Sequence, residues 1–494
     1  MQELHRAGCG ALVRASLLFA SFAPCAGFAG DLAPPVTPAI TAQAQSDAVP
    51  RAGAAPGQPG LNWDTAVRKN YLIPAFEIMG FDFLLNQANR HLWNEPDYRS
   101  NFKSIRNNLT GRWVVDTDNF KINQFLHPYQ GSMYHGFARS AGLSYWESSA
   151  ATFAGSLFWE IAGETTKPSK NDQVASGIGG SFLGEPLFRM ASLVLERGGD
   201  TPRFWREVGA ATISPSTGFN RLAFGERFDS VFSSRDAAIA SRVQFGGSLT
   251  ALTHQGVSQS FIRNEAVLDF SMDYGLPGKP GYSYTRPFDY FSFQATASSA
   301  NIFENIITRG LLVGKDYEAA NGTYKGVWGI YGSYDYIAPQ IFRVSTTALS
   351  LGTTAQWNLT HSVALQGTGL LGVGYGAAGT IHGVGERDYH YGATPQALLA
   401  LRLILGERAA VDVSARDYFV SRVASTEDRG SENIARGEAA VTLRVYRNHA
   451  VAVRYNYSRR EANYPDLGDR LQTRATFSIF YTLLNDRKFG VVQW

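Results

Sequence analysis

The feature that most constrains this chain is a two-residue period that runs through its C-terminal half. Between residues 470 and 483, apolar side chains such as Phe477 and Ile479 alternate with polar ones such as Arg474 and Ser478. Successive side chains of a β-strand point to opposite faces of the sheet, so this alternation gives one apolar and one polar face. Many such strands in series, with tyrosines near their ends and Trp494 closing the chain, predict a transmembrane β-barrel.

A soluble antiparallel barrel or sandwich also alternates, and this is the alternative interpretation. It is disfavoured because many of the runs exceed the ~5–6 residues that are usual for strands of soluble sheets. We count about twelve strand candidates, an even number of the kind that single-chain bacterial barrels use. They lie near residues 242–252, 260–273, 288–301, 303–317, 323–335, 341–357, 361–377, 389–405, 408–421, 434–447, 449–461 and 470–483. The segment 489–494 either completes the last strand or begins another.

Composition agrees with a barrel and excludes other classes of protein. Charged residues make up 18% of the chain, aromatic residues 13%, and 50 of the 494 residues are glycine. A net charge of only +3 predicts no nucleic-acid partner. No run of ~20 uncharged apolar residues exists, so an inner-membrane helix bundle is not expected.

The N-terminus has the pattern of a secretory signal peptide over residues 1–29. Arg6 and Arg14 form a basic region, residues 15–23 form a short apolar core, and small residues precede a cleavage site after Ala29. We therefore predict export from the cytoplasm and location in the outer membrane of a Gram-negative cell.

Both cysteines, Cys9 and Cys25, lie inside this segment. Cleavage would leave a mature chain without thiols, which excludes disulfides, cysteine nucleophiles and zinc–thiolate sites. Lipidation of Cys25 is the alternative, although the residues before it form a poor lipobox. Residues 30–62 are rich in Ala, Pro, Gln and Gly and are expected to be a disordered linker.

Between residues 63 and 214 the period changes from two to helical, which predicts a helical domain before the barrel. A capping box at Ser144 and Glu147 opens one helix, and a second box at Ser169 and Asp172 opens another. Further helices are expected at 73–91, 129–141 and 205–211. The fold class is thus α+β: a helical domain at 63–214, an irregular connector at 215–241, and an antiparallel barrel at 242–494. The helical domain is expected in the periplasm, or in or beneath the barrel.

One predicted helix carries Ser176, Gly180 and Gly184 at four-residue spacing. Each glycine inside a helix costs about 1 kcal/mol relative to alanine. Small residues at this spacing let a second helix approach closely, so we expect a tightly packed helical unit.

Ionisable residues recur inside the apolar helices of this domain. Glu160 lies within an apolar run, where ionisation is costly without a partner, and desolvation raises a carboxyl pKa into the range useful for acid–base catalysis. His127 and Glu160 together favour a functional site. Glu164 and Asp172 have a simpler structural interpretation, because a helix end and a capping box explain them. The sequence contains no recognised metal-ligand spacing, phosphate-binding loop or nucleophile elbow, so no metal or cofactor is predicted.

The blocks beginning at Trp113 (WVVDTDNFKINQFLHPYQGSMYHGFARSAG), at Trp159 (WEIAGETTKPSKND) and at Gly179 (GGSFLGEPLFR) carry a family resemblance. Over roughly residues 63–225 the chain resembles an uncharacterised family of bacterial outer-membrane proteins, a domain of unknown function followed by a barrel. The order of these motifs also resembles, more distantly, VanZ-like helical membrane domains, which are suspected of acting on lipid head groups or lipid-linked sugars. That resemblance implies that His127, Glu160 and Asp172 converge as catalytic residues. It also implies an anionic substrate group held with the help of Arg139 or Lys170, to which we add Glu164 and Asn123 as candidate binding residues.

Three functions remain open at this point. In the first, the helical domain is an enzyme that acts on a lipid head group or lipid-linked phosphate or sugar at the periplasmic face of the outer membrane. Outer-membrane lipid is then the ligand of the protein. His127 is the base or nucleophile, Glu160 is either the partner of His127 or the acid, and Asp172 is an orienting group. In the second, the barrel conducts a solute and the helices plug it. In the third, the protein has a structural role in the envelope.

Overall fold

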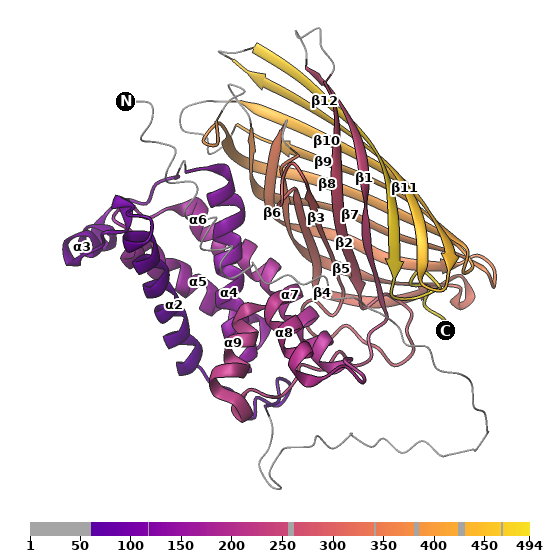
Figure 1. Cartoon of the computed structure of the whole chain (residues 1–494), viewed down its shortest axis with the longest axis horizontal. Helices are drawn as coiled ribbons and strands as arrows, with labels where there is room; N and C mark the ends of the chain where they lie inside the picture. Colours follow the sequence, from indigo (N-terminus) through magenta and orange to yellow (C-terminus); the bar gives the residue numbers. More distant parts are fainter. Residues whose placement is uncertain are drawn as a thin grey trace.

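The chain folds into a helical unit followed by a closed antiparallel barrel, as the computed structural model in Figure 1 shows. The structure describes residues 61–116, 118–254, 261–339, 342–379, 385–422, 430–465 and 468–494. The α+β fold class and the order of its two parts are confirmed. The expected signal peptide at 1–29 and nearly all of the expected linker at 30–62 lie outside the described residues.

The barrel has twelve strands, each hydrogen-bonded to its neighbours in chain order, and β1 closes the sheet against β12. Its strands are β1 Ile239–His254, β2 Phe261–Tyr274, β3 Phe291–Ser298, β4 Asn305–Ala319, β5 Tyr324–Ile337, β6 Arg343–Asn358, β7 Val363–Gly379, β8 His390–Leu405, β9 Ala409–Val420, β10 Ser431–Tyr446, β11 His449–Tyr464 and β12 Gly468–Leu484. The predicted count is confirmed, and most predicted bounds agree within three residues.

The alternation of β12 places its side chains as expected. Arg474 and Ser478 are buried in the lumen, whereas Phe477 and Ile479 are exposed on the outer wall. An apolar outer wall that is not covered by protein is the surface that lipid covers in membrane barrels. The chain therefore has the architecture of an outer-membrane β-barrel protein.

The C-terminal segment does not extend β12 or begin a strand, so that expectation was wrong. It turns back across the mouth of the barrel, where Gln356 donates to the Val492 carbonyl (2.7 Å) and accepts from its N–H (3.0 Å). Val492 packs with Tyr290, Tyr331 and Leu370 in one buried apolar cluster. Side chains and this segment thus fill that end of the lumen.

The helices of the first part are short and interrupted. They are α2 Leu72–His91, η2 Pro96–Tyr98, α3 Phe102–Thr110, η3 Ile122–Leu126, α4 His127–Ser140, α5 Tyr145–Phe158, η4 Trp159–Gly163, α6 Lys170–Val174, η5 Ala175–Gly179, α7 Gly180–Glu196, α8 Arg203–Ile213, α9 Pro215–Phe224 and η6 Gly225–Arg227. The expected connector at 215–241 is therefore partly wrong, because α9 occupies its first residues. Pro215 opens α9 at a position where its missing N–H costs nothing. No helix in the described part of the chain is long and apolar enough to cross a membrane.

Helices α4 and α7 approach each other closely along the small residues noted in the sequence. A Cβ atom on Gly180 would lie 2.6 Å from the Cα atom of Gly131, and one on Gly184 would lie 2.8 Å from the Cβ atom of His135. Such distances are below any normal carbon–carbon contact. The glycines are thus required for the packing of this helix pair, as predicted.

The helical unit packs against the outside of the barrel wall, not inside the lumen (Figure 1). On β5, Trp328 and Ile330 are exposed on the outer face, and Gly332, Tyr334 and Tyr336 continue that face but are covered. Phe182 of α7 lies against Gly332, and the Tyr334 hydroxyl donates to the Gln124 carbonyl (2.5 Å). The expectation of helices inside the barrel, and of helices that plug it, was therefore wrong. The physical reason is that an outer wall can bury side chains against helices as well as against lipid.

Candidate functional site

Three π-helical turns adjoin or contain residues of the candidate site. η3 ends directly before His127, η4 contains Glu160, and η5 contains Ser176. A π turn inserts one residue into a helix and re-aims the side chains around it; such turns are rare and occur frequently at functional sites. We call His127, Glu160, Glu164, Asp172 and Ser176 the His127 cluster.

His127 lies between a hydroxyl and a carboxylate. Its Nδ1 is 3.4 Å from the Ser176 Oγ, and its Nε2 is 3.9 Å from the Asp172 Oδ2. Both neighbours come from the segment α6–η5, and all three side chains are buried. Burial lowers the pKa of His127, and the acidic groups Glu164, Asp116 and Asp118 raise it by a smaller amount. The imidazole is therefore neutral at neutral pH and can accept a proton.

Glu160 replaces Asp172 in the second capping box. The Ser169 side chain accepts from the Asp172 N–H (3.1 Å), as predicted, but the Ser169 N–H donates to the Glu160 Oε2 (2.7 Å). Asp172 is thus not needed to close the box and turns toward His127. Burial, followed by the charges of Asp172 and Glu164, raises the pKa of Glu160 well above its usual range. Burial, followed by the charge of Asp116, does the same for Asp172.

Glu164 lies at the end of η4 and is half-buried. Its carboxylate accepts from the Trp159 indole N–H (2.7 Å) and from the Thr166 hydroxyl (2.9 Å). Burial raises its pKa to about 7, although the nearby His127 opposes this shift. The cluster therefore combines a neutral imidazole with carboxyl groups that hold protons near neutral pH, which is the pairing used in general acid–base chemistry.

The barrel wall completes the surroundings of this cluster through Tyr391 of β8. Its hydroxyl accepts from Asn171 (2.7 Å), Gln124 (2.9 Å) and Asn123 (3.2 Å). Asn171 also donates to the Asp172 Oδ1 (3.0 Å), so the wall is one hydrogen bond from the cluster. Asn123 is fully buried in this contact, where it joins the helices to the barrel.

The barrel has two ends, and one of them carries the start of β1 and the end of β12. The His127 cluster lies beside the other end. Phe120 donates to the Glu386 carbonyl (2.8 Å) and Asp118 pairs with Arg387 (2.9 Å), both in the β7–β8 connection. At the end that carries the start of β1 lie Ile239, Leu484, the tight turns at 320–323, 359–362, 406–408 and 447–448, and the longer β2–β3 connection at 275–290. Membrane barrels have short periplasmic turns and longer extracellular loops.

Arg139 does not belong to the His127 cluster. It is twelve residues further along α4, which is ~18 Å at 1.5 Å per residue. It binds Glu185 of α7 through two N–H groups (2.7 and 3.1 Å), and Arg189 binds the same carboxylate (2.8 Å) and Asp289 of the β2–β3 connection (3.1 Å). The assignment of Arg139 to an anionic substrate is corrected, because its charge already has a partner in a network that ties the helices to the barrel. Lys170 lies near the cluster in α6, and its side chain is exposed.

Ser176, Asn171 and Tyr391 complete the site and were not predicted as site residues. Ser176 had been assigned to packing alone, and nothing local in the sequence couples Tyr391 to helices more than 200 residues earlier. Within the described residues, no group of three or more His, Cys, Asp or Glu side chains is arranged to hold a metal ion.

A family model described as a domain of unknown function, DUF3943, matches residues 112–216. This confirms the resemblance to an uncharacterised family over that part of the chain, which contains all five members of the His127 cluster. Among curated proteins, none matches this chain.

Several solved structures resemble the barrel half. They include an anion-selective porin from Comamonas acidovorans, at 8% identity and a TM-score of 0.23 over 50% of this chain and 100% of the porin. The toluene transporter TodX of Pseudomonas putida is 8% identical with a TM-score of 0.21, over 50% of this chain and 89% of the transporter. The translocator domain of the autotransporter NalP from Neisseria meningitidis is 14% identical with a TM-score of 0.24, over 54% of this chain and 95% of that domain. Identity and TM-score are low, so the activities of these proteins are not carried over to this chain.

Proposed function

We propose that this outer-membrane barrel protein carries a proton-transfer site for a lipid head group or lipid-linked phosphate or sugar. The observation that supports it most is the buried His127 between the Ser176 hydroxyl and the Asp172 carboxylate, with the buried Glu160 carboxyl held by the N–H of nearby Ser169. The energetic cost of burying several acids beside a histidine argues for a use beyond packing.

A lipid substrate fits the outer surface of the helical unit. Helix α2 buries Asp82, Asn86 and Asn89 along with Pro74 and Ile78, whereas Leu72 is 70% exposed and Phe83 is 62% exposed on another face. This is the reverse of a helix in water, where polar residues face the solvent. Large exposed apolar side chains continue over the neighbouring helices, at Phe102, Leu109, Trp146, Phe153, Leu157, Phe158, Phe204, Trp205, Phe219 and Leu222.

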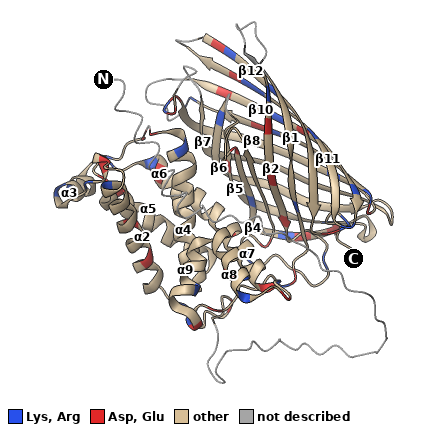
Figure 2. Cartoon of the chain, in the orientation of Figure 1, with Lys and Arg blue, Asp and Glu red and all other residues tan. Residues whose placement is uncertain are grey.

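Charge follows the same division. In Figure 2, Lys, Arg, Asp and Glu gather near α3 and α6 at one end of the helical unit and near α8 at the other, with few between. We call the exposed apolar side chains of the helical unit the apolar band, and the helices that carry them pack against the outer wall of the barrel. We infer that lipid contacts this band.

In this proposal His127 takes the proton of an attacking hydroxyl, that of water or of Ser176, and Asp172 holds the imidazole. The attacking oxygen bonds to the phosphorus or sugar carbon of the head group as the bond to the leaving oxygen breaks. Glu160 keeps its proton at neutral pH and donates it to the leaving oxygen. Lys170 is the remaining candidate for an anionic head group. The substrate requires a small opening of the helices, since the side chains of His127, Glu160 and Asp172 are buried.

A structural role is the second candidate, and the same burial favours it. Its three carboxyl groups also bond outside the cluster: Glu160 accepts from the capping N–H of Ser169, Glu164 from the Trp159 indole, and Asp172 from the Asn171 amide. A purely structural cluster would tolerate any replacement that keeps those bonds.

The experiment compares extracted envelope lipids from cells with and without this chain, by mass spectrometry. We expect one lipid class with an altered head group or phosphate content to accumulate when the chain is absent. Identical lipid profiles at equal growth would contradict the proposal. Lipid contact is tested separately with brominated lipids in proteoliposomes: they should quench the part of the fluorescence that Trp146→Phe removes, and an unquenched Trp146 would show that a protein covers the band.

A further inference from the structure

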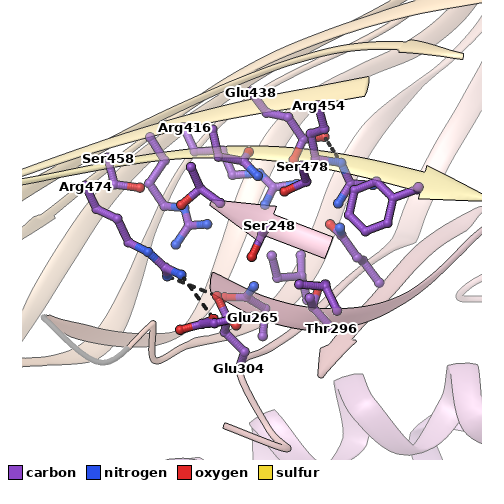
Figure 3. Close-up of a pocket in the computed structure, with 18 residues that line it drawn as sticks. Ser248, Glu265, Thr296, Glu304, Arg416, Glu438, Arg454, Ser458, Arg474 and Ser478 are labelled. Atoms are coloured by element: carbon purple, nitrogen blue, oxygen red, sulfur yellow. Dashed lines mark hydrogen bonds and ion pairs between the residues drawn. The ribbon is translucent and has the colours of Figure 1, made fainter. Parts of the chain in front are cut away.

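A polar cavity of about 60 Å³ lies in the lumen, between β9–β12 and β1–β4 (Figure 3). On this measure one water needs about 10–15 Å³, so the space holds a few waters or one small solute. Four arginines line it, with three glutamates. It lies inside the barrel and is separate from the His127 cluster, which is outside the wall.

Two of these arginines are paired with acids. Arg474 binds Glu304 (3.0 Å) and lies 3.9 Å from Glu265, and Arg454 binds Asp269 (3.3 Å) and lies 3.8 Å from Glu438. The three lining glutamates are thus each taken by a neighbouring guanidinium.

Arg416 and Arg436 differ from Arg454 and Arg474 in their charge partners. They are directly opposite each other in the β9–β10 register, and both line the cavity. Within the part of the chain that the structure describes, neither has a carboxylate at ion-pair distance. The Arg416 Nε and the Arg436 Nη1 are buried without a hydrogen-bond acceptor.

This arrangement is costly without a ligand. Like charges directly opposite on neighbouring strands destabilise a sheet, and an arginine does not lose its proton in a protein. Two adjacent guanidinium groups offer fixed N–H donors that match an oxyanion. The cavity size excludes a lipid or a sugar chain.

We propose that Arg416 and Arg436 form a binding site for one small oxyanion in the barrel lumen, a phosphate or carboxylate group. The ligand accepts from the two unsatisfied N–H groups and offsets the repulsion between the pair. The helical unit takes no part in it, so the site and the proposed lipid chemistry fail or succeed independently.

The test uses the full chain purified in detergent and equilibrium dialysis with labelled inorganic phosphate, with acetate and chloride as competitors. We expect saturable binding of one phosphate per chain, competition by acetate, and weaker competition by chloride at equal concentration. Arg416→Gln and Arg436→Gln should each weaken binding tenfold or more. Arg459→Gln is the matched control, because Arg459 is half-exposed on the outer wall and pairs with Glu461; it should bind like the parent protein.

Protein stability provides a second readout, which does not depend on detecting weak binding. Phosphate should raise the temperature at which the parent barrel unfolds on gels, and it should leave the Arg416→Gln/Arg436→Gln protein unchanged. No saturable binding together with a double variant that is more stable at every phosphate concentration would show simple repulsion and overturn the proposal. Equal competition by chloride and phosphate would overturn the oxyanion assignment.

Discussion

Replacement of Gly180 by alanine should destabilise the helical unit, although alanine is the better helix former. The substitution gains about 1 kcal/mol of helix propensity. The new Cβ would lie 2.6 Å from the Gly131 Cα and 2.7 Å from its carbonyl carbon. Carbon atoms prefer about 3.5–4.0 Å, so α4 and α7 must separate by about 1 Å. Overpacking of this kind costs about 1–3 kcal/mol, and more where backbone must move. Because the clash is with backbone, the cost lies at or above the upper end of this range, so we expect a net loss of about 2 kcal/mol for Gly180→Ala and a larger loss for Gly180→Leu.

Gly80→Ala is the matched control. Gly80 lies in α2, and nothing is within 4 Å of its Cβ position. This variant should gain up to about 1 kcal/mol. The assay is limited proteolysis of membranes across a urea series, which follows loss of the region before residue 214. The Gly180 variants should lose that region at lower urea while the barrel stays resistant. Equal stabilisation by both alanine variants would refute the account of the α4–α7 contact.

Three further predictions address location, pH and attachment. The protein should fractionate with the outer membrane and migrate differently on gels with and without heating. A soluble form whose gel mobility does not change on heating would contradict the barrel assignment. Glu164 should contribute stability to the helical unit that is fully present below pH 4.5 and is lost as pH rises through 7, since its pKa is about 7 in the fold against 4.5 ordinarily. This linkage is worth up to ~3 kcal/mol, and a urea midpoint equally pH-dependent in Glu164→Gln would contradict it. Asp289→Ala removes the acid that Arg189 and Arg235 share, so it should weaken the attachment of the helical unit to the barrel by ~3–5 kcal/mol while the other contacts remain; unchanged protease resistance would refute this.

The barrel could be predicted from the sequence because its period is local. In each strand, neighbouring residues such as Phe477 and Ser478 alternate between apolar and polar. The limits of this alternation give the limits of the strand. The same period could not reveal that helices cover part of the wall. Tyr334 and Tyr391 alternate as lipid-facing aromatic residues would, and only the three-dimensional arrangement shows that they hydrogen-bond to the helices.

The candidate site was partly predictable for a similar reason. A histidine and a glutamate in apolar helices indicated burial, and His127 and Glu160 do lie in one region. Arg139 could not be placed, since its partner Glu185 is on another helix. The role of Asp172 was hidden as well, because Glu160 takes its part in the capping box from nine residues away. Each π turn inserts one residue into a helix, and the 3.6-residue period used to predict helices does not reveal such an insertion.

Glu160 separates chemistry from packing most directly. Glu160→Gln keeps the volume and can still accept from the Ser169 N–H, whereas Glu160→Ala leaves that donor unpaired at a cost of ~1–3 kcal/mol. A purely structural Glu160 would therefore give a normal Gln variant and a less abundant Ala variant.

The central measurement is the lipid profile of cells that carry Glu160→Gln, made beside an immunoblot of its abundance in the outer membrane. General acids contribute ~10²–10⁴-fold to rate. We therefore expect Glu160→Gln cells to have the lipid profile of cells without the chain, although the variant protein is present at normal abundance. His127→Gln should give the same profile, because residues that act as one unit are not additive. A parental lipid profile in Glu160→Gln cells at normal abundance would contradict the proposed catalytic role and leave a structural barrel protein as the better account.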